Sequence, residues 1–74
     1  MYKYDAIFKF KNGFAKVYKD KLYGIIDINY KEVIPIEYED IADITNSIFL
    51  VKKDGKIGLI RNDGSILLEP NITP

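Results

Sequence analysis

The chain has 74 residues, which is short for a single domain of the usual size of about 100 to 200 residues. Eleven Lys and Arg residues balance eleven Asp and Glu residues, and the chain contains no His, Cys or Trp. This composition excludes disulfides, thiolate or imidazole metal sites and histidine acid/base catalysis. The formal net charge is zero, so the chain lacks the basic excess of a dedicated nucleic-acid binder. We expect one small domain, residues 1–74.

Turn residues divide the chain into strand-length segments. Short turn signals such as Asn12-Gly13 and Asp54-Gly55 lie between apolar runs, which predicts β-hairpins. The stretches at residues 4–11 and 38–45 fit either an extended lead-in or a single helical turn. No long helix is expected. The predicted strands cover residues 14–19, 22–27, 32–36, 48–53, 56–61 and 65–69.

The two halves of the chain repeat one another. Shifting the sequence by 34 residues aligns seven identical pairs, among them Val17 with Val51 and Gly24 with Gly58. A fixed period indicates a duplicated unit, here repeat one at residues 4–37 and repeat two at residues 38–74. The predicted fold class is therefore all-β, with two consecutive three-stranded antiparallel β-meander repeats that form a small curved sheet or a barrel-like domain.

Two glycines lie in the middle of predicted strands. Gly24 and Gly58 occupy equivalent positions, where glycine weakens a strand unless the backbone bends or another segment comes close. The two strands that contain these glycines carry large apolar residues on both faces, so both faces of each strand must be covered. We predict a structural role for the two glycines rather than a ligand role.

The hairpins of the two repeats differ in their turn residues. Repeat two has Gly55 and Gly64, which take positive φ without a Cβ clash. Repeat one has Lys21 and Tyr30 at these positions, so we expect Asn29 to supply the left-handed residue of the later turn.

The combined pattern resembles the WG β-repeat family, also called KWG repeats. It consists of NGFAKV at residues 12–17, DKLYGIID at residues 20–27 and VIP at residues 33–35, with Tyr38-Glu39 opening the next unit. At the positions of the signature Trp-Gly the chain has Tyr23-Gly24 and Ile57-Gly58, so both tryptophans are replaced and both glycines are kept. The resemblance implies short antiparallel strands, usually in longer bacterial arrays, with a role in recognition or scaffolding and no general catalytic activity. Two units are few, so we expect either a short member, such as a small phage or mobile-element protein that binds a larger protein, or a fragment.

Four carboxylates lie around the start of the second repeat, namely Glu37, Glu39, Asp40 and Asp43. Such a cluster can hold a divalent cation or act as an acid/base pair in a small hydrolase. Calcium loops place their carboxylates around a glycine turn, however, and this stretch contains no glycine. We favour a solvated acidic face and expect no metal, no cofactor and no enzymatic activity.

Five lysines concentrate in the first repeat, namely Lys9, Lys11, Lys16, Lys19 and Lys21. They are interleaved with aromatic residues, and this combination on a small sheet can bind single-stranded nucleic acid by stacking. The aromatics occupy positions that the repeat needs for its core, and the chain has one Arg. A core with a solvated edge is favoured, and a nucleic-acid or nucleotide-ligand binder remains the alternative.

Charge is divided unevenly along the chain. Residues 1–36 hold seven basic and four acidic groups, and residues 37–74 hold four basic and seven acidic groups. Opposite charges on the two halves favour head-to-tail association. We predict a partner interface that contains Ile36, Ile48, Leu50, Tyr18 and Tyr38.

These observations lead to one functional hypothesis. The chain is predicted to be a non-enzymatic β-repeat module for protein–protein recognition or self-assembly, with a larger protein or a second copy of itself as the partner. The first residues lack the apolar stretch of a signal peptide, and no run approaches the roughly 18 apolar residues of a membrane span. We therefore expect a cytoplasmic protein without membrane contact.

Overall fold

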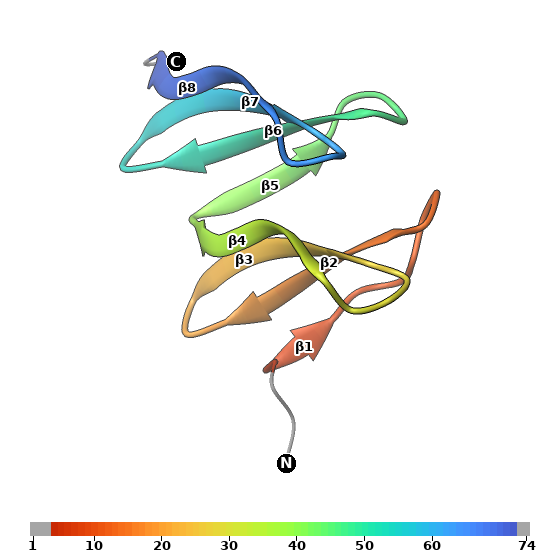
Figure 1. The fold of residues 1–74 in the computed structure, drawn as a ribbon. Helices are drawn as coiled ribbons and strands as arrows, with labels where there is room; N and C mark the ends of the chain where they lie inside the picture. The colour runs from red at the N-terminus through yellow and green to blue at the C-terminus, as the bar shows by residue number, and fades with distance from the viewer. Residues whose placement is uncertain (1–3, 73–74) are drawn as a thin grey trace.

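The computed structural model describes residues 4–72, which form eight β-strands in two separate antiparallel sheets (Figure 1). The first sheet contains β1 (Ala6–Ile7), β2 (Phe14–Lys19), β3 (Leu22–Asp27) and β4 (Glu32–Tyr38) in this order. The second contains β5 (Asp40–Asp43), β6 (Ile48–Lys53), β7 (Lys56–Arg61) and β8 (Ile66–Ile72). The predicted all-β fold is confirmed. The described chain has no helix long and apolar enough to span a membrane.

Each repeat forms four strands where the sequence predicted three. The two lead-in segments are extended and contribute β1 and β5, which pair with β2 and β6 at the edge of each sheet. Both sheets stay open, so the domain is a pair of curved sheets and not a closed barrel. A single residue, Glu39, connects β4 to β5 and carries the chain from one sheet to the other.

The strand register is the same in both repeats. Val17 pairs with Gly24 between β2 and β3, and Val51 pairs with Gly58 between β6 and β7. Between β3 and β4, and between β7 and β8, the register shifts at each glycine and again after the next residue, so β4 and β8 bulge opposite the glycines. The duplicated sequence therefore folds into two copies of one structural unit.

The later turn of the first repeat corrects one prediction. Tyr30, and not Asn29, takes the left-handed conformation, with a φ of 63°, at the position where Gly64 has a φ of 92°. The Tyr30 N–H donates to the carbonyl oxygen of Asp27 at 2.9 Å, just as Gly64 N–H donates to Arg61 at 2.9 Å. A hydrogen bond between residues three positions apart closes the same turn in both repeats. The turn therefore requires a left-handed residue at the position of Tyr30 and Gly64, whichever residue is present.

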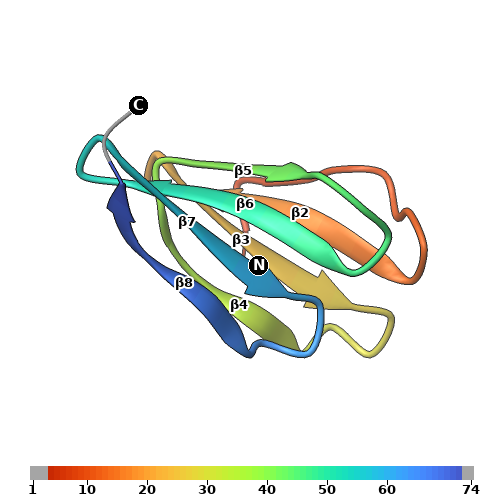
Figure 2. The same ribbon diagram turned by 90° about the horizontal axis from the view of Figure 1, so that it is seen from above.

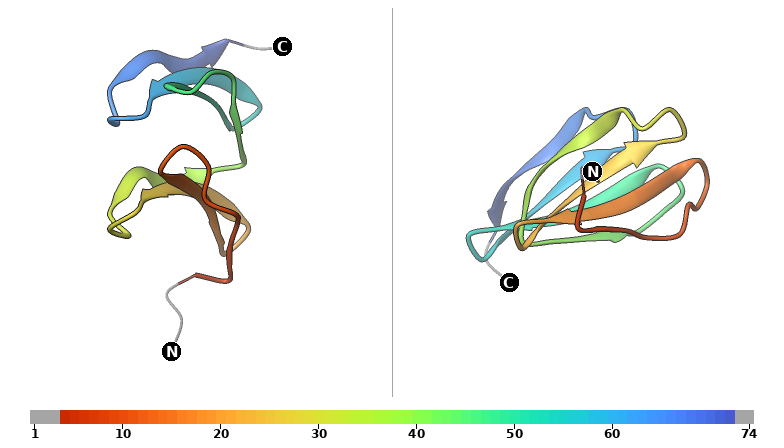
Figure 3. Two further views of the ribbon diagram at one scale, coloured as in Figure 1. Left: turned by 90° about the vertical axis from the view of Figure 1, so that its right-hand side faces the viewer. Right: turned by 90° about the horizontal axis from the view of Figure 1, so that it is seen from below.

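The second sheet is stacked on the first (Figure 1). Seen from above, β6, β7 and β8 follow nearly the same course as β2, β3 and β4 (Figure 2), and each sheet is curled rather than flat (Figure 3). The main core comprises Ile25, Ile34, Tyr38, Ile41, Phe49, Val51 and Ile60, which come from both sheets. A smaller cluster of Tyr4, Ala15, Val17 and Ile26, with Ile36 packed against it, lies on the other face of the first sheet.

Both mid-strand glycines face the backbone of a neighbouring strand. A Cβ atom at Gly24 would lie 2.8 Å from the carbonyl oxygen of Ile34, and one at Gly58 would lie 2.6 Å from that of Leu68. Real Cβ atoms do not approach other atoms so closely. The glycines therefore allow β4 and β8 to bend across β3 and β7, which gives each sheet its curl.

Candidate functional site

The second sheet leaves one apolar face without a covering layer. Phe49 and Val51 point into the core, so the alternating residues of the same strand point away from the first sheet. Cross-strand pairing places Leu50, Leu59 and Leu68 in one row across the middle of this outer side. We call it the open face, and it consists of Ile48, Leu50, Ile57, Leu59 and Leu68, all partly exposed.

The first sheet buries the equivalent surface. Ile25 and Ile34, the repeat partners of Leu59 and Leu68, pair with each other and are 2% and 0% exposed. They are buried because the second sheet packs on them. The open face is therefore the surface on which a further layer of the same kind would lie.

At the opposite end of the stack, the smaller cluster is itself buried, but Ile7 beside it is exposed. The smaller cluster, with Tyr4 and Ile36, forms what we call the basal face of the first sheet. Ile7 pairs with Val17 of this cluster and is 44% exposed, whereas its repeat partner Ile41 is 2% exposed between the sheets. A layer that continued the stack below the first sheet would cover Ile7.

The structure separates the residues predicted for the interface. Ile48 and Leu50 lie on the open face, whereas Ile36 lies on the basal face at the other end of the stack. Tyr38 is 4% exposed and belongs to the core, so its ring is not available to a partner. Tyr18 is partly exposed, and its ring lies 4.8 Å from that of Tyr23 on the first sheet, between centroids.

Sequence reasoning missed three residues of the open face, namely Ile57, Leu59 and Leu68. Alternation within a strand separates two faces but does not say which of them another layer covers. The 34-residue shift contained the missing signal, because it pairs Leu59 and Leu68 with Ile25 and Ile34, whose cover comes from the following repeat.

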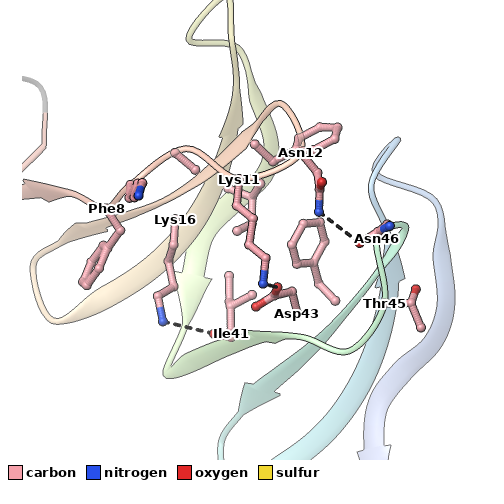
Figure 4. Close-up of a pocket in the computed structure, with 13 residues that line it drawn as sticks. Phe8, Lys11, Asn12, Lys16, Ile41, Asp43, Thr45 and Asn46 are labelled. Atoms are coloured by element: carbon pink, nitrogen blue, oxygen red, sulfur yellow. Dashed lines mark hydrogen bonds and ion pairs between the residues drawn. The ribbon is translucent and has the colours of Figure 1, made fainter.

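A second feature is a pocket of about 170 Å³ at one side of the stack, lined by both repeats (Figure 4). Phe14 and Phe49, whose rings meet edge to face at 6.2 Å between centroids, contribute to its apolar wall together with Ile25 and Ile41. The side-chain amide of Asn12 donates to Asn46 Oδ1 at 3.0 Å across the pocket mouth. The pocket therefore has an apolar interior and a polar rim.

Three of the five predicted lysines line this pocket. Lys11 Nζ lies 3.1 Å from Asp43 Oδ2, and Lys16 Nζ donates to the carbonyl oxygen of Ile41 at 3.2 Å (Figure 4). Lys9 is the third. The remaining two, Lys19 and Lys21, belong to the end of β2 and its turn into β3 and do not line the pocket. The predicted basic face is thus divided.

The four carboxylates around the start of the second repeat contact separate partners. Glu37 lies 3.8 Å from Lys53, Glu39 accepts a hydrogen bond from the Gly55 N–H at 2.8 Å, and Asp40 accepts one from the Ile41 N–H at 2.9 Å. Asp43 faces Lys11, as described above. Within residues 4–72, no group of three or more acidic side chains is arranged to hold a metal ion.

Two side chains near these surfaces have shifted ionisation. Burial raises the pKa of the Tyr38 hydroxyl above its ordinary value, and the neighbouring Glu37 carboxylate raises it further. The hydrogen bond from Lys11 lowers the pKa of the Asp43 carboxyl group. Asp43 is therefore ionised at neutral pH and pairs with the Lys11 ammonium group.

Two curled four-stranded meanders, stacked in the same orientation with one strand order and register, define a repeat protein built from β-sheet layers. The family model described as WG containing repeat matches residues 2–23 and 23–56, so the chain belongs to the WG-repeat family. Tyr23-Gly24 and Ile57-Gly58 occupy the signature positions, with the glycine kept in both. No curated protein and no solved structure gives a match.

Proposed function

We propose that the chain is a non-enzymatic recognition and assembly module that buries its open face against a protein partner. The row formed by Leu50, Leu59 and Leu68 carries this proposal. Its equivalent in the first sheet is buried by a second layer of the same fold, so its shape and chemistry suit another protein surface. A second copy of the chain is the partner that the repeat geometry favours.

Continuing the stack by one repeat assigns a contact to each end. Within the chain, Asn12 of the lower layer donates to Asn46 of the upper layer. If a second copy followed in the same register, Asn46 of one molecule would meet Asn12 of the next, which preserves the amide pair. Within the chain, Lys16 contacts the backbone of Ile41. At the contact between copies, their repeat equivalents would meet in the same way, so Leu50 of one molecule would lie over the backbone of Ile7 of the next. The apolar Leu50 would therefore meet the exposed and apolar Ile7.

Charge differs between the two repeats as wholes. The second repeat has an excess of acidic groups and the first an excess of basic groups, although Lys52 and Arg61 lie on the open side beside Ile57 and Ile48. Head-to-tail contact brings unlike charges together, whereas contact between two open faces brings like charges together. Exposed pairs contribute only about 0–1 kcal/mol each, so the leucine row contributes most of the affinity.

The alternative role in nucleic-acid binding has less support. Lys11 and Lys16 already contact Asp43 and the Ile41 carbonyl, and Lys19 and Lys21 lie outside the pocket that the other lysines line. A strand of nucleic acid is held along a continuous basic groove with aromatic platforms. The separated lysines therefore favour a protein partner.

Two charge substitutions test the arrangement by sedimentation velocity over a wide concentration range. Leu59→Lys blocks the open face and Ile7→Lys blocks the basal end, so each variant alone should be monomeric. A mixture of the two should form a dimer, because each variant keeps the end that the other lacks. Ile28→Lys, at a residue that is 68% exposed in a turn, is the control and should associate like the parent.

The possible failures of this experiment are distinguishable. Association that Leu59→Lys abolishes but Ile7→Lys does not change would mean that two open faces meet. A parent that stays monomeric at every concentration would refute self-assembly and leave a different protein as the partner. The recognition role itself would fail if the Leu59→Lys variant associated like the parent and also bound an apolar dye as strongly as the parent does.

A further inference from the structure

The pocket between the repeats is large enough for a small molecule. Its volume is about 170 Å³. An apolar protein cavity of about 150 Å³ holds benzene, so one ring or a short aliphatic chain fits here. The pocket is separate from the open face, because none of the five residues of that face lines it.

The interior of the pocket favours an apolar and preferably planar ligand. Ile25 and Ile41 are each 2% exposed and Phe49 is 8% exposed, so they pack within the core and only a small part of each faces the pocket. The edge-to-face pair of Phe14 and Phe49 presents ring surfaces against which a further ring can pack. Phe8, which is 44% exposed, stands at the outer side of the pocket.

The rim favours a negative charge. Lys9, Lys11 and Lys16 line the pocket together with a single acidic residue, Asp43. The Lys16 ammonium group has three donors, and its contact with the Ile41 carbonyl uses one of them. The rings of Phe8 and Tyr23 lie 5.1 and 4.9 Å from Lys16 Nζ and hold the ammonium group at the pocket.

One carboxylate already occupies part of this rim. Asp43 Oδ2 lies 3.1 Å from Lys11 Nζ, and both side chains are largely exposed, so the pair is weak and exchangeable. The contact shows that the rim accommodates a carboxylate beside the apolar wall. A ligand carboxylate between Lys11 and Lys16 would replace Asp43 as the partner of Lys11.

We propose that this pocket binds a small monocarboxylate with an apolar body, of about the size of benzoate. The carboxylate accepts hydrogen bonds from Lys16 and Lys11, and the apolar body packs on Phe49 and Phe14. Nucleotides are too large for the volume, and the described lining residues include no arginine to hold a phosphate by a bidentate contact. Because both repeats line the pocket, the ligand stabilises their stacking by mass action.

A titration of the isotopically labelled protein followed by amide chemical shifts tests the proposal. Benzoate should shift amides of the segments that line the pocket, namely the β1–β2 and β5–β6 connections and the facing part of β2. Benzamide, which keeps the ring and lacks the charge, should bind about tenfold more weakly or worse, because it loses the charge-assisted hydrogen bonds. Acetate, which keeps the charge and lacks the ring, should also bind more weakly.

Three variants complete the experiment. Lys16→Met should weaken benzoate binding by about tenfold or more, whereas Lys19→Met, a change in the same strand outside the pocket, should leave it unchanged. Asp43→Asn should strengthen binding about two- to fivefold, because it removes the competing carboxylate. Amide spectra of the variants without ligand verify the fold, and Lys11→Met replaces Lys16→Met if that variant fails to fold.

The proposal is overturned by any of three results. These are no saturable shift with benzoate, equal affinity for benzoate and benzamide, or shifts confined to the open face. Acetate binding as tightly as benzoate would also overturn it, because the pocket would then be a simple anion site. None of these results bears on self-assembly through the open face, which is measured separately.

Discussion

Replacing Gly58 by alanine tests the close approach that gives each sheet its curl. The new Cβ atom would lie 2.6 Å from the Leu68 carbonyl oxygen and 2.7 Å from the Pro70 nitrogen, both of them backbone atoms. A backbone cannot rotate away as a side chain can, so β8 must shift by several tenths of an ångström along its ladder with β7. Overpacking of this kind costs about 1–3 kcal/mol, and we expect at least about 2 kcal/mol here.

This loss is large for such a small domain, whose total stability is roughly 4 to 11 kcal/mol. Urea denaturation, followed by far-ultraviolet circular dichroism, measures it as a lower midpoint with an unchanged slope. Gly55→Ala is the matched control, because a Cβ there meets nothing within 4 Å and only the φ of +77° is unfavourable. That strain costs about 1 kcal/mol. If Gly58→Ala cost no more than Gly55→Ala, the close approach would not constrain the sheet.

Three further predictions concern single side chains. Lys21 has a φ of 70° at the position where the second repeat has Gly55, so Lys21→Gly should raise the stability by up to about 1 kcal/mol. Thermal melts measure this, and a lower melting temperature would contradict it. Tyr38 has a raised pKa in the folded state, so its contribution to stability is complete below about pH 10 and is lost as pH rises through the folded pKa. Tyr38→Phe should therefore show a shallower alkaline loss of stability, and an identical pH profile would contradict this. Asp43→Asn should change stability by less than about 0.5 kcal/mol in urea, because its pair with Lys11 is largely exposed.

Local turn chemistry explains why most strands could be predicted. The predicted strands at residues 14–19, 22–27, 48–53 and 56–61 coincide with β2, β3, β6 and β7, because short turns with positive-φ residues end them. The last strand of each repeat continues past its predicted end, to Tyr38 and Ile72. The bulge opposite each glycine lets the strand resume pairing, and a bulge of this kind has no clear local signature in the sequence.

The candidate surfaces depended on information that no single strand contains. Whether Leu59 or Ile60 faces a covering layer is decided by the direction in which the next repeat stacks, and this is a property of the Glu39 connection. The same direction buries Tyr38 and leaves Ile7 exposed. The pocket has a similar origin, because it forms where two distant loops are brought side by side (Figure 4).

The stacking direction also explains why the two ends of the molecule should associate more weakly than its two halves. Within the chain, Phe14 meets Phe49 at the layer contact, whereas a following copy would place Ile48 against Ala15, a smaller pair that fills the space less well. The internal contact also gains from the short Glu39 connection, which holds the two sheets at a high effective concentration. Contact between copies lacks both advantages and has to rely on the leucine row. Because the repeats are related by translation along the stack, the contact is heterologous, so any association should grow with concentration instead of closing as a symmetric dimer.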